Sequence, residues 1–211
     1  MKTSMDRLMK SLFILALAAL TACASSPHGG GSGSKVPLRF SYAAPDHWIR
    51  INVSKFVMFT REDPFSQYIL IQQRPVEKPF KHAKRGFDPG MVPLEAAEVV
   101  REEIASDEDV LDLNVLEISP AEVNGYNGFK IEFTYRTRKG HRFRTLYYGF
   151  LNDEWYYSIR YNAEEDKFSE TDVTTFQKVL GTFRILSVER DSNGHPTHQK
   201  CPSVSSGEEK G

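Results

Sequence analysis

The sequence predicts an α+β domain, with an antiparallel sheet of about six to eight strands and two main helices. Apolar and polar residues alternate in short segments before residue 75 and after residue 113, which is typical of strands. Two further segments space their apolar residues three or four positions apart, which is typical of amphipathic helices. Because tight turns join most of the expected strands, neighbouring strands must pair antiparallel.

The segment 38–74 is predicted to form short strands. Alternation is clear at Ile49, Ile51 and Val53, and proline-containing turns at 44–46 and 61–64 interrupt the pattern, because proline cannot donate a ladder hydrogen bond. The expected strands are 49–53, 56–60 and 68–72. Residues 75–93 contain four prolines and are predicted to form a long irregular link.

A first helix is predicted to begin at Pro93, because the fixed φ of proline suits the first helical position, and to end near Asp107. A strand at Leu113–Ile118 follows. The dipeptides Asn124-Gly125 and Asn127-Gly128 each predict a turn.

The strongest alternation comes next, where apolar side chains every second residue point to one face and fix the register. These side chains are Phe129, Ile131, Phe133 and Tyr135. Turns at 139–140 and 152–153 then predict strands at 142–151 and 155–161, and a last helix is expected with its N-cap at Ser169 or Thr171. The aromatic residues of these strands predict a core or the lining of a ligand groove. Tyr148 and Tyr156 are expected on the face opposite Trp155 and Tyr157.

Three segments resemble the PsbP/Mog1-like proteins, in particular the small exported lipoproteins of that fold. They are Tyr42–Trp48, the Val123–Phe129 turn into a strand, and the Phe176–Phe183 helix running into Arg184-Ile185-Leu186. The resemblance covers about residues 38–188. It implies an α/β/α sandwich and a binding or assembly role without catalysis.

The N-terminus predicts export. Lys2, Arg7 and Lys10 precede an apolar run at 12–20 that is shorter than the roughly 20 residues of a spanning helix, which is the layout of a signal peptide. The segment Leu20–Cys23 resembles the lipobox of bacterial lipoproteins, which implies cleavage before Cys23 and a lipid on its sulfur. An ordinary cleavage site at Ala22 or Ala24 is the alternative.

The expected organisation has four parts: a lipoprotein signal peptide at 1–22, the acylated Cys23 with a flexible linker at 23–36, a globular domain at 37–190 and a disordered tail at 191–211. Ala24 and Ser25 follow the cysteine, where an aspartate would favour retention at the inner membrane. We therefore expect the periplasmic face of the outer membrane, or the outer face of the cytoplasmic membrane if the cell has one membrane.

The charge is nearly balanced, with 27 basic and 28 acidic residues, which argues against a nucleic-acid partner. Familiar nucleophile, P-loop and paired-cysteine motifs do not occur in the sequence. His195, His198 and Cys201 are weak metal candidates, but the polar tail that carries them lacks a fourth ligand. We expect no cofactor apart from the covalent lipid on Cys23.

Basic residues concentrate in the long link and around one hairpin tip, and together they form a candidate anion-binding surface. They are Lys78, Lys81, Lys84, Arg85, Arg136, Arg138, Lys139, Arg142 and Arg144. The structural alternative is a solvated hairpin whose charges prevent edge pairing. Acidic residues gather at 102–112, where a solvated acidic face is the simplest interpretation.

These observations predict a lipid-anchored, non-catalytic domain that binds an envelope protein or an anionic envelope component and has no nucleic-acid partner. Two alternatives remain: a periplasmic hydrolase-like enzyme with dispersed catalytic residues, and a lipoprotein that binds a small ligand.

Overall fold

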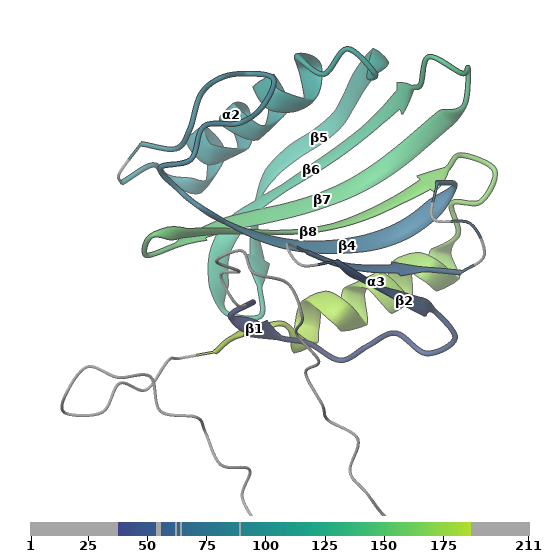
Figure 1. Cartoon of the computed structure of the whole chain (residues 1–211), viewed down its shortest axis with the longest axis horizontal. Helices are drawn as coiled ribbons and strands as arrows, with labels where there is room; N and C mark the ends of the chain where they lie inside the picture. The colour runs from purple at the N-terminus through teal and green to yellow at the C-terminus, as the bar shows by residue number, and fades with distance from the viewer. Residues whose placement is uncertain (1–37, 54–55, 62, 64, 89, 187–211) are drawn as a thin grey trace, which may run out of the picture. The chain divides into compact units, whose positions relative to one another are not determined.

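The computed structural model describes residues 38–53, 56–61, 63, 65–88 and 90–186 (Figure 1). The elements are β1 (Phe40–Ser41), β2 (Ile49–Val53), β3 (Phe56–Thr60), β4 (Gln67–Pro75), α2 (Pro93–Ala105), β5 (Leu111–Val123), β6 (Tyr126–Arg136), β7 (Arg142–Asn152), β8 (Trp155–Glu164), α3 (Glu170–Thr182) and β9 (Arg184–Ile185). The described residues therefore confirm the α+β class.

One antiparallel sheet of seven strands has the order β2-β3-β4-β8-β7-β6-β5, and β1 pairs with β9 in a separate two-stranded sheet. The pairing of β4 with β8 joins the early strands to the later meander, in a register that runs from Gln67 opposite Ala163 to Pro75 opposite Trp155. Figure 1 shows these two strands side by side in the middle of the sheet. The link and α2 are thus inserted between two halves of one sheet.

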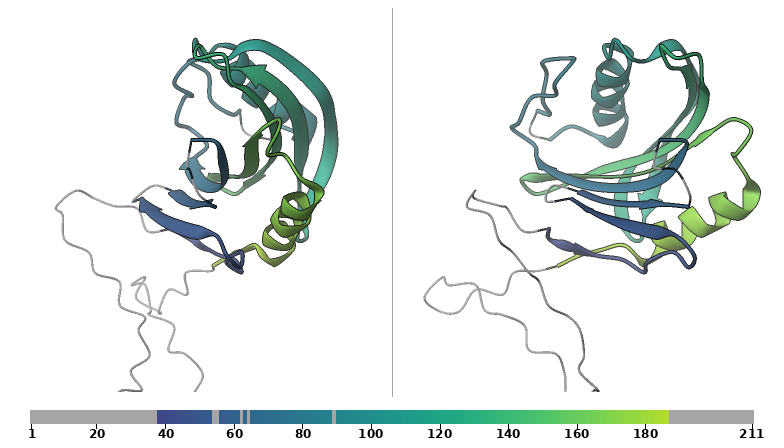
Figure 2. Two further views of the ribbon diagram at one scale, coloured as in Figure 1. Left: turned by 90° about the vertical axis from the view of Figure 1, so that its right-hand side faces the viewer. Right: turned by 45° about the vertical axis from the view of Figure 1, so that its right-hand side comes forward.

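The two helices lie on opposite faces of the sheet (Figure 2). Phe129, Ile131 and Phe133 pack with the buried side chains of α2, whereas Tyr157 and Ile159 pack with those of α3. Successive strand residues point to opposite faces, so one strand supplies side chains to both cores. The α/β/α layering expected from the resemblance is present.

Both helices begin as their sequences predict. Pro93 is the first residue of α2, and the Glu95 carboxylate accepts the backbone N–H of Val92 at 3.1 Å. Ser169 is the N-cap of α3, where its side chain accepts the backbone N–H of Asp172 at 3.2 Å. Each contact satisfies a backbone donor that the first turn leaves free.

The prediction of two adjacent turns was half wrong. Asn124 and Gly125 form the turn between β5 and β6 with φ values of 45° and 91°, but Gly128 lies inside β6. A Cβ at Gly128 would lie 2.3 Å from the carbonyl oxygen of Gly149. Glycine is needed there because two strands approach closely, not because the chain reverses.

Two further expectations need correction. The strand expected at 113–118 is longer and spans Leu111–Val123, because its pairing with β6 continues to the turn. Tyr148 does not share a face with Tyr156: it packs against Phe176 of α3 with ring centroids 5.8 Å apart, whereas Tyr156 belongs to the core under α2. The prediction failed because the register between β7 and β8 cannot be read from either strand alone.

The signal peptide, Cys23, the linker and the tail with His195, His198 and Cys201 lie outside the described residues, so these predictions stay open. In the described part of the chain, no helix combines the length and apolar character needed to span a bilayer. That same part contains no group of three or more potential metal ligands of the histidine, cysteine or carboxylate type.

Candidate functional site

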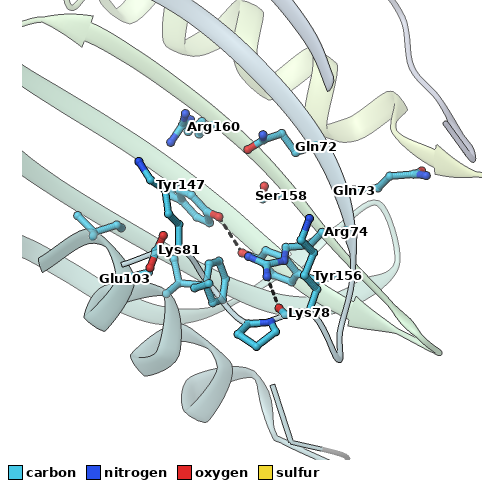
Figure 3. Close-up of a pocket in the computed structure, with 14 residues that line it drawn as sticks. Gln72, Gln73, Arg74, Lys78, Lys81, Glu103, Tyr147, Tyr156, Ser158 and Arg160 are labelled. Atoms are coloured by element: carbon cyan, nitrogen blue, oxygen red, sulfur yellow. Dashed lines mark hydrogen bonds between the residues drawn. The ribbon is translucent and has the colours of Figure 1, made fainter. Parts of the chain in front are cut away.

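A cleft of about 580 Å³ lies between the sheet, α2 and the link that precedes this helix (Figure 3). It forms because α2 packs over β5, β6 and β7 and leaves the neighbouring face of β8 and β4 to be covered by the link. Its lining consists of Gln72, Gln73, Arg74, Lys78, Pro79, Phe80, Lys81, Val100, Glu103, Ile104, Tyr147, Tyr156, Ser158 and Arg160.

The polar wall of the cleft follows from strand register. Gln72 lies opposite Ser158 and Arg74 lies opposite Tyr156, so these side chains share the face that α2 covers. Gln73 points to the other face, as Figure 3 shows, and its Oε1 accepts the backbone N–H of Arg39 at 2.7 Å. Alternation on β4 and β8 therefore brings several polar side chains into one apolar environment.

Arg74 is held at one end of the cleft. Its guanidinium donates to the backbone carbonyl of Lys78 and lies over the ring of Phe80, 3.9 Å from the ring centroid. Burial lowers the pKa of Arg74, although Tyr156, Tyr147 and Glu103 partly oppose this effect. No carboxylate among the described residues forms an ion pair with Arg74, and its buried Nε has no hydrogen-bond partner among them.

Arg160 lies on the floor of the cleft and, like Arg74, has a guanidinium without an ion pair in the described residues. Its guanidinium lies 5.5 Å from the ring centroid of Tyr68, and its buried Nε also lacks a partner within the described chain. Burial alone would lower the pKa of Arg160, but the surrounding tyrosines, Tyr68 first among them, leave that pKa raised. A guanidinium stays protonated at neutral pH, so Arg160 carries a positive charge, and no carboxylate in the described part of the chain forms an ion pair with it.

Tyrosine hydroxyls complete the floor. The Tyr147 and Tyr156 hydroxyl oxygens are 2.9 Å apart and hydrogen-bonded. Burial, followed by the influence of Tyr147, raises the pKa of Tyr156 well above its usual value. Burial likewise raises the pKa of Tyr135, which does not line the cleft and whose hydroxyl donates to Asn162 at 3.2 Å. Tyr135 and Tyr156 therefore stay protonated at neutral pH and can donate a hydrogen bond without carrying charge.

The link is fixed to both α2 and the sheet. One Glu103 oxygen accepts the backbone N–H groups of His82 and Ala83, both at 2.8 Å. Phe87 packs against Tyr156 with ring centroids 4.6 Å apart. These contacts hold the exposed Lys78 and Lys81 at the mouth of the cleft.

The structure does not gather the nine predicted basic residues on one surface. Lys78 and Lys81 line the cleft, whereas Arg85 lies 3.6 Å from Glu102 and 3.9 Å from Asp88. Lys84, like Arg85, is exposed and does not line the cleft.

The hairpin residues lie apart from the cleft, and most of their charges are paired. Arg136 lies 2.8 Å from Asp112, and Arg138 lies 3.0 Å from Glu108 and 3.2 Å from Asp109. Arg144 pairs with Glu132, while Lys139 and Arg142 have no ion pair within the described residues. The acidic residues that follow α2 thus neutralise Arg136 and Arg138 but not the other basic residues of the hairpin. Only the three-dimensional fold could bring these opposite charges together.

A second hollow, of about 670 Å³, lies beside this hairpin and is lined in part by Phe65, Arg138 and His141. His141 Nδ1 lies 2.7 Å from Glu164, and Arg138 is already paired with carboxylates. The lining also contains the unpaired Lys139, but its three carboxylates outnumber Arg138 and Lys139, so the second hollow offers less to an anion than the cleft does.

Arg74 and Arg160 were not among the predicted site residues. The sequence pattern that could have identified them is a basic residue within a buried strand, where alternation places tyrosines on the same face. The aromatic groove expected as an alternative is present in part, since Tyr147 and Tyr156 line the cleft. Phe150 and Tyr157 instead belong to the core on the α3 side.

No family model matches the sequence, and no curated protein matches it. Among solved structures, the chain is similar to the cyanobacterial PsbP protein CyanoP from Synechocystis, with 13% identity, a TM-score of 0.49, and coverage of 76% of this chain and 99% of that chain. It is also similar to LpqN of Mycobacterium tuberculosis, described as involved in cell envelope biogenesis, with 13% identity, a TM-score of 0.48, and coverage of 70% and 83%.

Proposed function

We propose that this chain is a lipid-anchored, non-catalytic envelope protein whose domain binds an anionic envelope component in the cleft. The observation that carries the proposal is the state of Arg74 and Arg160. Each arginine is half-buried and forms no ion pair with a carboxylate of the described residues. Each Nε is buried and has no hydrogen-bond partner among them. A buried charge without a partner is costly, so an anionic ligand would stabilise this arrangement.

Binding without turnover is the favoured activity. The described lining contains no histidine or cysteine, and the carboxylate of Glu103 is engaged by two backbone N–H groups. A nucleophile such as the Ser158 hydroxyl would need an adjacent base, which the lining does not supply. The geometry fits recognition through charge-assisted hydrogen bonds.

The anchor is proposed from the sequence, because the basic and apolar segments before Cys23 have the layout of an exported lipoprotein. Two or three acyl chains on Cys23 would make desorption from the membrane slow. Mass spectrometry of the native protein, combined with membrane fractionation, tests this part. We expect a chain that begins at a lipid-modified Cys23 in the outer-membrane fraction, and an unmodified cysteine would contradict the anchor.

The binding activity is tested by calorimetric titration of the full-length protein, purified in detergent, with phenyl phosphate and benzenesulfonate at low salt. We expect the protein to bind at least one of these organic anions. Arg160→Gln should weaken binding about tenfold or more, because a hydrogen bond to a charged group contributes about 1.5–3 kcal/mol. Arg184→Gln, at an exposed position on β9, is the matched control and should bind as the unmodified protein does. Absence of binding to both anions would contradict the proposal.

A further inference from the structure

We propose that the ligand of the cleft is a phosphate monoester carried on an apolar group. This inference rests on the proposed anion-binding function and specifies the chemistry of the anion.

The charge of the lining favours a dianion. Arg74, Lys78, Lys81 and Arg160 contribute four positive charges, and Glu103 is the single carboxylate among the described lining residues, so the net charge is three positive. One Glu103 oxygen already accepts two backbone N–H groups at 2.8 Å. A carboxylate or sulfonate would bring one negative charge, whereas a phosphate monoester carries about −1.5 to −2 near neutral pH.

The donors approach from several directions. Arg160 and the tyrosine pair belong to the sheet, whereas Lys78 and Lys81 belong to the link at the mouth. The Tyr147–Tyr156 hydrogen bond uses one of the two phenolic protons, so the other proton stays free to donate to a ligand. A phosphate group offers three acceptor oxygens in a tetrahedral arrangement, which suits this distribution better than the two coplanar oxygens of a carboxylate.

The remaining wall is apolar, and the cleft is larger than a bare phosphate requires. Phe80 from the link and Val100 and Ile104 from α2 line the side opposite the sheet residues. The volume of about 580 Å³ lies within the range of roughly 300–1,000 Å³ that is typical of small-molecule sites. An aromatic or aliphatic group attached to the phosphate would cover this wall and exclude water from it.

The experiment compares phenyl phosphate with benzenesulfonate, which have the same ring and a tetrahedral anionic group but differ in charge. At about pH 7.5 we expect the full-length protein to bind phenyl phosphate at least about tenfold more tightly. At about pH 5.5, below the second phosphate pKa of about 6, this preference should shrink. Benzenesulfonate keeps its charge over this range and reports any effect of the protein's own titration.

Lys81→Gln should reduce the preference for phenyl phosphate, and Lys178→Gln on the exposed side of α3 is the matched control that should leave it unchanged. Inorganic phosphate should bind more weakly than phenyl phosphate, because it leaves the apolar wall uncovered. If nanodiscs containing phosphatidic acid displace phenyl phosphate, a lipid headgroup is the source of the phosphate. If they do not displace it, the source is a free phosphate ester.

The outcomes separate the two proposals. Equal affinity for phenyl phosphate and benzenesulfonate would overturn the phosphate inference and leave the anion-binding function intact. Failure to bind either compound would overturn both.

Discussion

Gly128 offers a direct test of the close approach between β6 and β7. A Cβ at this position would lie 2.3 Å from the Gly149 carbonyl oxygen and 2.7 Å from the Cβ of Phe150, both of which belong to the neighbouring strand. Comfortable contacts between carbon atoms are about 3.5–4.0 Å, so Gly128→Ala requires the strands to separate by roughly 1 Å. The clash cannot be relieved by a side-chain rotation, because the nearest atom belongs to the backbone.

The expected cost of Gly128→Ala is about 3 kcal/mol. Overpacking contributes about 3 kcal/mol, the upper end of its usual range, because the closest contact would be only 2.3 Å. A weakened ladder hydrogen bond adds about 1 kcal/mol, and the lower entropy of the unfolded alanine chain returns about 0.4–1 kcal/mol. For a domain of this size the unfolding temperature should fall by roughly 6–12 °C. Urea unfolding, followed by near-ultraviolet circular dichroism, measures this change in stability. The midpoint urea concentration should fall, while the slope of the free energy of unfolding against urea concentration should stay the same.

Gly181→Ala is the matched control, because a Cβ at that position in α3 would meet nothing within 4 Å. Alanine has the higher helix propensity, so this variant should be stabilised by about 0.5 kcal/mol. The same substitution of glycine by alanine is thus expected to destabilise the protein at position 128 and to stabilise it at position 181. A Gly128→Ala midpoint at or above that of the unmodified protein would refute the reasoning.

Two other predictions concern a helix cap and an ion pair. Ser169→Ala should lower the free energy of unfolding by about 1 kcal/mol, because it removes the acceptor of the Asp172 backbone N–H. Ser169→Gly should lower it by only a few tenths of a kcal/mol. Equal losses of stability for the two variants in urea unfolding would contradict the capping role. Burial alone would raise the pKa of Glu132, but the hydrogen bonds from Arg144 and Lys130 lower it overall. Because the folded pKa is the lower one, this contribution to stability is complete above the unfolded value of about 4.3 and is lost as the pH falls through the folded value. Glu132→Gln should therefore flatten the acid side of the stability profile, and parallel profiles for the two proteins would exclude this assignment.

Local chemistry was enough to predict much of the fold. Proline at 93 and serine at 169 mark the helix starts because their backbone and side-chain preferences act within one turn of the chain. The alternation at Phe129, Ile131 and Phe133 defines which side chains are buried together, since successive strand residues must point to opposite faces. Asn124-Gly125 supplies the positive φ values that its turn requires. Each of these signals depends on neighbours in sequence, so one chain is sufficient to read it.

The candidate site depended on pairing between distant segments. The register of β4 against β8 places Arg74 opposite Tyr156, and the packing of Phe87 on Tyr156 brings the link with Lys78 over the same face. The register also decided the face of Tyr148, which sequence reasoning placed wrongly.

The sequence by itself determined the α+β class, the helix starts and the alternation within individual strands. Only the tertiary structure decided which basic residues face a cleft and which are neutralised. Arg138 forms ion pairs with Glu108 and Asp109, whereas Arg160 is surrounded by tyrosines and forms no ion pair with a carboxylate of the described residues. The physical reason is that the availability of a charge depends on the groups within a few ångströms of it. Those groups come from segments whose separation in sequence carries no information about their distance in space.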